Sequence, residues 1–237
     1  MIFVTGDVHR EADIHTINPD EFIQGRTLTK EDYVIICGDF GCIWYGDKTD
    51  DFWLKWLDSL PWTTLFIDGN HENFDLLYQF PVKEWHGGKV HEIRPSVLHL
   101  MRGQVFELDS KKIFTFGGAY SLDVEYREMG KNWWREELPT ISEINEARKN
   151  LKENNYEVDY IITHDIYLSH PLSKRLPKGM CLYNENQYDL QLFLEELKNE
   201  VHYDAWFHGH YHRDEKADDR CYTLFNRIIN VDELEQF

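Results

Sequence analysis

Short apolar runs that end at Gly-Asp or Asp-Gly pairs are the feature that most constrains how this chain folds. Residues 2–5, 33–37 and 63–67 are rich in β-branched and aromatic side chains, and such a pair stops each run. Runs of this length and composition predict strands that are buried on both faces. Residues 50–60 place apolar side chains at helical spacing and are followed by Pro61, which predicts a helix. Strand, helix, strand in this order predicts a parallel βαβ unit.

The middle of the chain has a different pattern. Residues 89–93, 97–101, 104–108 and 111–116 are short strand candidates separated by Arg-Pro, Arg-Gly and Asp-Ser. This spacing predicts an antiparallel meander. Residues 117–140 have no clean period and are rich in charge and Trp. We therefore expect a long ordered loop there, of a kind that is often functional.

The rest of the chain returns to alternating helices and strands. The candidates are helices over 141–154 and 187–200, strands over 159–163 and 204–208, and a closing stretch over 221–230. The first helix has an approximate capping box, in which Ser142 is followed three residues later by Asn145 and then by Glu146. Because no repeat, low-complexity tract or linker is found, the sequence predicts one α/β domain over residues 1–237.

Composition excludes some classes of function. The chain has 25 Lys and Arg against 43 Asp and Glu, a formal charge of −18. This argues against tight non-specific nucleic-acid binding through a broad basic face, because phosphate neutralisation dominates such binding. It fits a protein that carries bound cations, although many proteins are acidic for solubility alone. With 42 % apolar and 15 % aromatic residues, the chain is too rich in core formers to be disordered.

The cysteines and the N-terminal segment indicate the compartment. Cys37, Cys42, Cys181 and Cys221 have no CxxC spacing, so we expect neither a disulfide framework nor a structural zinc site. The first residues lack the basic and long apolar regions of a signal peptide. No apolar run approaches the length of a membrane span. We therefore expect a soluble cytoplasmic protein that does not bind membranes.

Polar side chains follow the predicted strands at the point where each strand ends. The carboxyl ends of strands in open α/β sheets are where ligand sites gather, so these side chains should meet at one edge. Carboxylate, amide and imidazole donors without thiolate suit Mn, Fe, Zn or Ni. His208 ends an apolar strand and is interpreted as a core or supporting residue, and His170 as structural. The strand-end residues are Asp7, His9, Asp39, Asn70, His71, His164, His210 and His212.

These motifs, DxH, GD, GNHE, a lone His and GHxH in this order, resemble the calcineurin-like metallophosphoesterases from Asp7 to His212. The chain is also similar to an uncharacterised subgroup of small bacterial or phage-associated members. The resemblance implies a four-layer α/β/β/α sandwich of two mixed sheets, with two divalent transition metal ions, of which Mn is favoured. It implies that Asp39 bridges the two ions. One ion would be held by Asp7, His9 and His212, and the other by Asn70, His164 and His210.

The implied chemistry is hydrolysis of a phosphate ester by a hydroxide that bridges the two metals, with charge neutralised on the non-bridging oxygens. His71 is expected to protonate the leaving oxygen or to hold the phosphate. In the protein-phosphatase branch an Asp that orients this His stands where the chain has Cys42. Either Asp68, Glu72 or another acid must orient His71, or its role is weakened, and protein Ser/Thr phosphatase activity is disfavoured.

Three residues are candidate substrate contacts. Arg10 stands where a Gly is expected and could meet a phosphate, or be a solvated arginine. In the 117–140 loop, Arg127 could pair with a phosphate, and Trp134 could stack a base or simply pack the loop down.

The predicted function is a phosphatase or phosphodiesterase. Its substrate would be a small phosphorylated metabolite, a nucleotide or a short nucleic-acid end. The alternatives are a nuclease that acts with a partner subunit and a non-catalytic metal-binding scaffold of the same fold.

Overall fold

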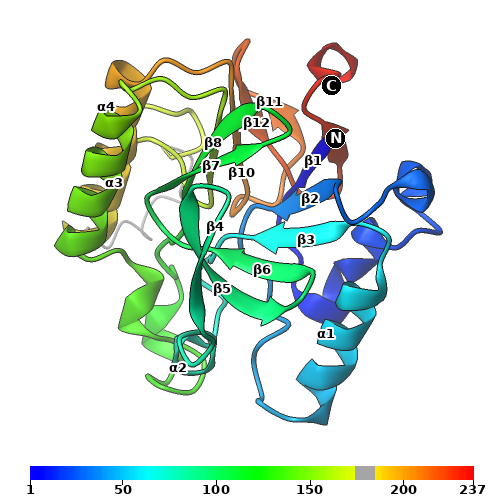
Figure 1. Cartoon of the computed structure of the whole chain (residues 1–237). Coiled ribbons are helices and arrows are strands. Elements are labelled where there is room, and N and C mark those ends of the chain that lie inside the picture. The colour runs from blue at the N-terminus through cyan, green and yellow to red at the C-terminus, as the bar shows by residue number, and fades with distance from the viewer. Residues whose placement is uncertain (174–184) are drawn as a thin grey trace.

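The computed structural model describes residues 1–173 and 185–237, so Cys181 lies outside the described residues. In the described part, two mixed β-sheets face each other and helices cover their outer faces (Figure 1). The seven-stranded sheet has, in spatial order, β13 (Ile228–Asn230), β1 (Ile2–Thr5), β2 (Tyr33–Ile36), β3 (Thr63–Phe66), β6 (Val97–Leu100), β5 (Gly88–Arg94) and β4 (Val82–Trp85). The six-stranded sheet has β11 (Glu215–Lys216), β12 (Cys221–Thr223), β10 (Ala205–His208), β9 (Tyr160–Thr163), β8 (Lys111–Phe116) and β7 (Gln104–Leu108).

The helices lie on the two outer faces. The α-helices are α1 (Lys48–Ser59), α2 (Phe74–Leu77), α3 (Ile141–Glu153) and α4 (Glu185–Glu200). The 3₁₀ turns are η1 (Arg10–Ala12), η2 (Ile14–Ile17), η3 (Ile23–Thr27), η4 (Val124–Tyr126), η5 (Arg135–Glu137) and η6 (Leu234–Gln236). In Figure 1, α1 lies on the far side of the molecule from α3 and α4, with both sheets between them. The predicted four-layer α/β/β/α sandwich is confirmed.

Side-chain alternation along the strands creates the layers. In β1, Val4 points into the core between the sheets, while Phe3 packs on the other face, in the cluster that contains Leu54 and Leu57 of α1. Successive strand side chains point to opposite faces, so one buried strand supplies two cores. On the six-stranded sheet, Phe114 of β8 likewise faces a third cluster under α3 and α4.

Parallel pairing brings the central strand ends to a common level. β1 pairs with β2 and β2 with β3, with Thr5 opposite Ile36 and Ile36 opposite Phe66. In the other sheet β9 and β10 are also parallel, with Thr163 opposite His208. The loops that leave these five strands therefore begin at one edge of the sandwich, as predicted.

Two expectations about strand pairing were wrong. The predicted meander over residues 89–116 is split, because β6 pairs with β3 and β5 in one sheet while β7 pairs with β8 in the other. Residues 221–230 likewise contain two strands, β12 and β13, one in each sheet. The alternation of apolar residues is the same whichever sheet a strand joins, so sequence pattern does not distinguish the partners.

Smaller differences occur at element ends. The capping box of α3 is formed by Thr140 and Glu143, two residues before the expected position. Helix α1 begins at Lys48 because Asp47 caps it, with its side chain accepting from the backbone N–H of Thr49. Strand β4 was not predicted. Within the described residues, no helix is both long and apolar enough to cross a membrane.

Candidate metal centre

The predicted site residues lie where β1, β2, β3, β9 and β10 end, between the two sheets. Close approach there requires glycine. A Cβ atom on Gly69 would collide with Oδ1 of Asp39, and one on Gly209 would collide with Oδ1 of Asp7. The glycines of the GD, GN and GH motifs thus allow loops from different strands to reach one centre.

The first half of the site contains Asp7, His9, Asp39 and His212. One ligand atom from each of these side chains lies within 4.8 Å of the others. Nε2 of His9 is 3.3 Å from Oδ2 of Asp39, and Nε2 of His212 is 3.0 Å from Oδ2 of Asp7. Both carboxylates are buried, whereas the His212 side chain is 50 % exposed. The group is therefore open to solvent on one side.

The second half contains Asn70, His164 and His210. Nδ1 of His164 donates to the carbonyl oxygen of Cys37 at 2.7 Å, which leaves Nε2 to face the site. Nε2 lies 3.2 Å from Oδ1 of Asn70 and 3.3 Å from Oδ1 of Asp39. The ring of His210 packs against that of His164, with centroids 5.1 Å apart. Nε2 of His164 and Oδ1 of Asn70 thus lie close together beside Asp39, with the His210 ring packed against the His164 ring.

The carboxylates create a field that favours positive charge at this place. Burial opposes protonation of His9, but Asp39 and Asp7 outweigh it and raise the pKa of His9 to about 9. In the same way, burial opposes charge on His164, and Asp39 and Asp7 raise the pKa of His164 to about 10. Burial would raise the pKa of Asp39, but His164 and His9 hold it well below its usual range. The field that retains these protons would also attract a metal cation.

A buried oxygen atom of Asp7 gives a further reason to expect a metal ion at this site. Oδ2 of Asp7 is fully buried and has no hydrogen bond of acceptable geometry to the described residues. Nε2 of His212 approaches this oxygen at 3.0 Å, but a buried carboxylate oxygen that no hydrogen bond satisfies is destabilising unless a cation is bound to it. The donor set of carboxylate, amide oxygen and imidazole, with no thiolate among its members, suits hard or borderline divalent ions.

Backbone strain also gathers here. Asp39, His210 and His212 have φ values of 50°, 66° and 49°, in the left-handed region that residues with a Cβ rarely adopt. Residues held in such conformations cluster at active sites and ligand-binding sites, where the surrounding structure enforces them.

His71 lies beside the centre but is not oriented by the expected acids. Its backbone N–H donates to Oδ1 of Asp39 at 2.8 Å, and its ring packs against the ring of His9. Asp68 instead pairs with Arg102 and His99, while Glu72 accepts from the backbone N–H groups of Phe40 and Gly41.

The group that meets the His71 ring is Arg127. Its two terminal nitrogens lie 3.2 and 3.3 Å from Nδ1 and Nε2 of His71, as in a stacked pair. Burial, followed by the charge of Arg127 and nearby histidines, lowers the pKa of His71. Cys42, which replaces the orienting Asp of the protein-phosphatase branch, is buried in a hydrophobic core cluster.

The other two candidate substrate contacts are engaged elsewhere. Trp134 is 4 % exposed, packs edge to face on Trp44, and donates its indole N–H to Asp75. This ring anchors the loop and has no free face for a substrate, which corrects the expectation that it could stack a base. Arg10 pairs with the exposed Glu11 and lies over the ring of Tyr45, while its Nη1 is buried without a hydrogen bond to the described residues.

A second cluster of possible ligands, His170, His208 and Cys221, is fully buried. Its members already have hydrogen-bond partners within the protein. Nε2 of His208 meets Oγ1 of Thr223 at 2.9 Å, and Nδ1 of His170 accepts from the backbone N–H of Leu172. These contacts are those of core residues, the role expected for His208 and His170.

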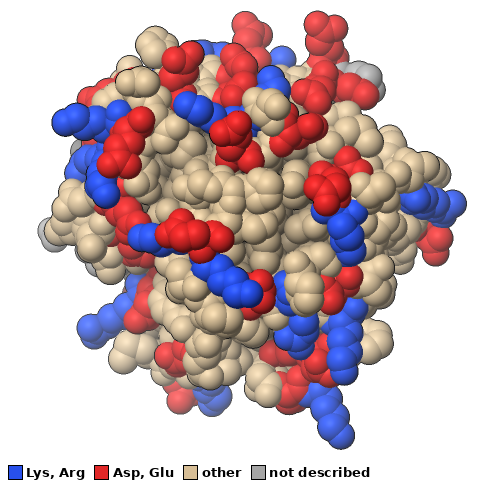
Figure 2. All heavy atoms as spheres, in the orientation of Figure 1, with Lys and Arg blue, Asp and Glu red and all other residues tan. Residues whose placement is uncertain are grey.

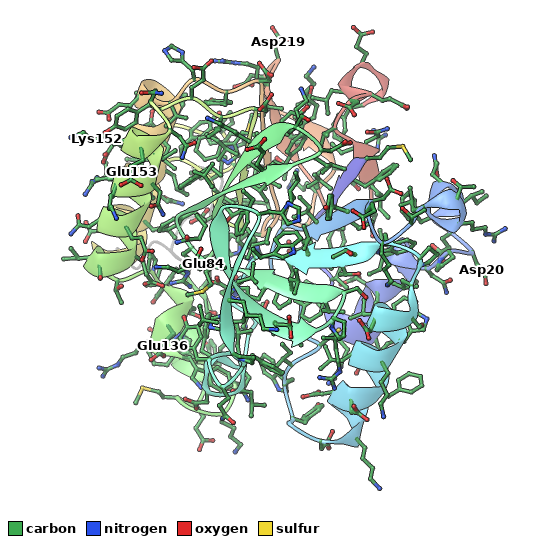
Figure 3. The ribbon with its side chains drawn as sticks, in the orientation of Figure 1. Asp20, Glu84, Glu136, Lys152, Glu153 and Asp219 are labelled. Atoms are coloured by element: carbon green, nitrogen blue, oxygen red, sulfur yellow. The ribbon has the colours of Figure 1, made fainter. Side chains whose placement is uncertain are left out.

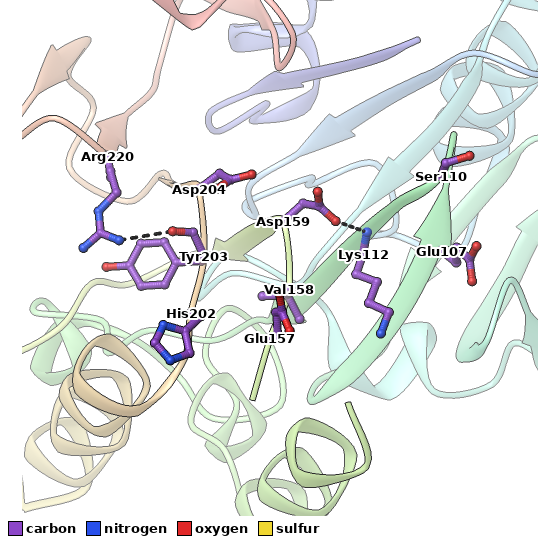
Figure 4. A pocket seen from close by; sticks show the side chains of 10 residues that line it. All are labelled: Glu107, Ser110, Lys112, Glu157, Val158, Asp159, His202, Tyr203, Asp204 and Arg220. Atoms are coloured by element: carbon purple, nitrogen blue, oxygen red, sulfur yellow. Dashed lines mark hydrogen bonds between the residues drawn. The ribbon is translucent and has the colours of Figure 1, made fainter. Parts of the chain in front are cut away.

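A surface hollow of about 600 Å³ lies at the opposite, amino-terminal ends of β9 and β10 (Figure 4). In this hollow Arg220 donates to the carbonyl oxygen of Tyr203, and the backbone N–H of Lys112 donates to Asp159. It contains none of the candidate ligands and is not part of the site.

Several supporting residues were not found by sequence reasoning. Asp13 accepts from Nδ1 of His9 at 2.7 Å, which directs Nε2 of His9 toward Asp39. Its spacing of four residues from His9 on a helical turn is a signal that could have identified it. Ser121 accepts from the Asn70 side-chain NH₂ group, and Glu137 in turn accepts from the Ser121 hydroxyl. Nothing in the local sequence marks either residue.

The fold and the site together define an α/β/β/α sandwich with a cation-attracting cluster at its strand ends. The family model described as calcineurin-like phosphoesterase matches residues 1–214. The chain belongs to the calcineurin-like phosphoesterase family, as its motifs predicted. A search of curated proteins returned no match. The family uses divalent metals, and the ligand cluster of this chain agrees with that.

Proposed function

We propose that the protein is a two-metal-dependent phosphoesterase that hydrolyses a phosphomonoester or phosphodiester. The observation that carries this proposal is the position of Asp39. Its two carboxylate oxygens lie 3.3 Å from Nε2 of His9 and 3.3 Å from Nε2 of His164, respectively. A carboxylate that faces two separate groups of donors is suited to bridge two ions. Family membership supports the same reaction class.

Each residue has a proposed role. Asp7, His9 and His212 hold one ion, Asn70, His164 and His210 hold the other, and Asp39 contacts both. Bound there, the ions would activate a water molecule and neutralise charge on the phosphate oxygens. His71 donates a proton to the leaving oxygen, because it lies beside Asp39 and the ring of His9 without being one of the ligands.

The substrate is proposed to be a small phosphorylated metabolite, a nucleotide or a short nucleic-acid end. In Figure 2 acidic and basic side chains are interspersed on the visible face, around a large uncharged area. Such a surface offers no continuous basic track for a long polyanion. Mn²⁺ is the proposed metal. The described cysteines, Cys37, Cys42 and Cys221, are free, which supports a cytoplasmic location.

The test is hydrolysis of bis(p-nitrophenyl) phosphate and p-nitrophenyl phosphate by chelator-stripped protein with added Mn²⁺. We expect metal-dependent turnover, and its ratio between the diester and the monoester identifies the substrate class. Asp39→Asn should lower kcat by roughly a thousandfold or more, because it removes the charge that both ions share.

The control is Asp20→Asn, a change of the same chemistry at an exposed side chain that projects from the periphery (Figure 3). Its activity should equal that of the wild type. If the wild-type protein binds two Mn²⁺ ions and hydrolyses neither ester nor any phosphorylated nucleotide or metabolite of a broad panel, the catalytic proposal is wrong and a metal-binding scaffold replaces it.

A further inference from the structure

The orientation of the Asn70 amide decides whether the second half of the site can hold a cation. Only the carbonyl oxygen of an asparagine side chain can bind a metal ion, and its NH₂ group would repel one. Asn70 is 6 % exposed and lies between two polar neighbours, His164 on one side and Ser121 on the other. The structure must therefore fix which end faces His164.

Ser121 and Glu137 fix that orientation through the direction of their hydrogen bonds. Oγ of Ser121 lies 2.8 Å from Oε2 of Glu137, and the backbone N–H of Ser121 donates to Oε1 at 3.1 Å. An ionised carboxylate can only accept, so the serine hydroxyl must donate to Glu137. With its proton so committed, Oγ can only accept from Asn70, whose Nδ2 lies 3.2 Å away. The Asn70 oxygen then faces Nε2 of His164.

Glu137 is built into the loop for this contact. Its side chain is 1 % exposed and also accepts from the indole N–H of Trp133 at 2.7 Å. Burial raises the pKa of Glu137, whereas these hydrogen bonds favour the charged carboxylate. The neighbouring Glu136 is exposed and points away from the protein (Figure 3), so the loop buries one carboxylate of the pair and leaves the other in solvent.

We propose that Ser121 and Glu137 are positioning residues of the metal centre, which orient Asn70 so that its oxygen is available to a divalent cation beside His164. This inference rests on the proposed function, because it assigns a supporting role at the same site. It makes the 117–140 loop part of the centre, since that loop supplies both residues and also Arg127, which contacts His71. Substitution of a residue that hydrogen-bonds a metal ligand typically lowers the affinity for the metal by roughly 10- to 100-fold.

The experiment measures Mn²⁺ binding to chelator-stripped protein by calorimetry and by electron paramagnetic resonance. In the wild type we expect two ions and the spectrum of a coupled pair. Glu137→Gln has the same shape, but its NH₂ group can donate to Ser121. The hydrogen bonds from residue 137 through Ser121 to Asn70 would then run in the opposite direction. We expect this variant and Ser121→Ala to bind the second ion roughly 10- to 100-fold more weakly and to give a mononuclear spectrum.

Two matched variants separate positioning from general damage to the loop. Glu136→Gln makes the same chemical change on the exposed neighbour and should bind both ions as the wild type does. Ser121→Thr keeps the hydroxyl and should restore most of the affinity that Ser121→Ala loses. Wild-type binding of both ions by Glu137→Gln would overturn the inference, and so would loss of both ions in Glu136→Gln. If the wild type itself binds no Mn²⁺, the proposed function fails instead.

Discussion

The guanidinium of Arg127 contacts the ring of His71, and its only ion pair among the described residues is a weak one. Its Nε atom donates to Asp123 at 2.7 Å, but that carboxylate is 54 % exposed, and exposed pairs contribute little. Arg127→Ala should therefore raise KM for an anionic ester roughly 10- to 100-fold, since a hydrogen bond to a charged group contributes about 1.5–3 kcal/mol. Steady-state kinetics with a phosphomonoester would measure this, and kcat should change less than KM.

The control for Arg127 is Arg135→Ala, which removes an equal charge from an exposed position of the same loop. It should leave KM within about twofold of the wild type, because a distant exposed charge is screened by salt. If both variants shift KM equally, the effect is one of net charge, and Arg127 does not contact the phosphate.

For single residues, the sequence was enough to locate the candidate ligands, but not the residues that hydrogen-bond to them. The candidate ligands could be named because each follows a short buried strand, and parallel strands end at one edge. Ser121 and Glu137 could not be named, because Ser121 contacts Asn70 across 51 residues of sequence and Glu137 acts only through Ser121, so both depend on how one loop folds. Trp134 was ambiguous for the same reason, since tryptophan suits both a binding surface and a core.

Strands β5 and β6 carry a stacked histidine pair that should make stability depend on pH. His91 and His99 have parallel rings 5.2 Å apart, with their Nδ1 atoms separated by 2.9 Å. Burial, followed by the neighbouring His99, lowers the pKa of His91 from its ordinary 6.5 to about 4. Because the folded pKa is depressed, this residue contributes stability that is present above pH 6.5 and lost as the pH falls toward 4.

Urea unfolding of chelator-stripped protein at pH 7.5 and 5.5 tests this contribution. His91 should account for about 1 kcal/mol of the stability lost between these two conditions. His91→Gln removes the titrating group, so the variant should lose less stability than the wild type over the same interval. An equal loss in both proteins would show that His91 is not the group responsible.

Strands and helices were predicted accurately where the local sequence pattern identifies them. The prediction was poor where it depended on which strands pair with each other. The runs that became β1, β2 and β3 were recognised because their apolar side chains are consecutive and stop at glycine. The meander was wrong because the chain crosses from one sheet to the other between β6 and β7, and the Arg102-Gly103 turn looks the same for a hairpin and for a crossing. When both faces of a strand are buried, its apolar residues form a continuous run, and that run does not indicate which sheet the strand joins.

For the whole molecule, the candidate centre joins the two sheets. Asp7, His9, Asp39 and Asn70 follow strands of the seven-stranded sheet, whereas His164, His210 and His212 follow strands of the six-stranded sheet. Without metal ions, the buried carboxylates of Asp7 and Asp39 hold protons on His9 and His164 at this junction, in a chain whose formal charge is −18. Ions bound there would replace those protons and cross-link the sheets through their ligands, so metal binding and folding should be coupled.

Thermal unfolding measures this coupling without any substrate. At a free Mn²⁺ concentration about 100 times the dissociation constant, binding of one ion to the folded state alone adds about 2.7 kcal/mol. For a chain of this size that corresponds to a rise in Tm of roughly 5–10 °C over chelator-treated protein. Asp39→Asn should show a much smaller rise, and its metal-free Tm should fall below that of the wild type, because the buried His9 and His164 side chains lose the carboxylate that faces them. If Mn²⁺ raises the Tm of both proteins equally, the stabilising ions bind elsewhere on the acidic surface, and Asp39 does not bridge them.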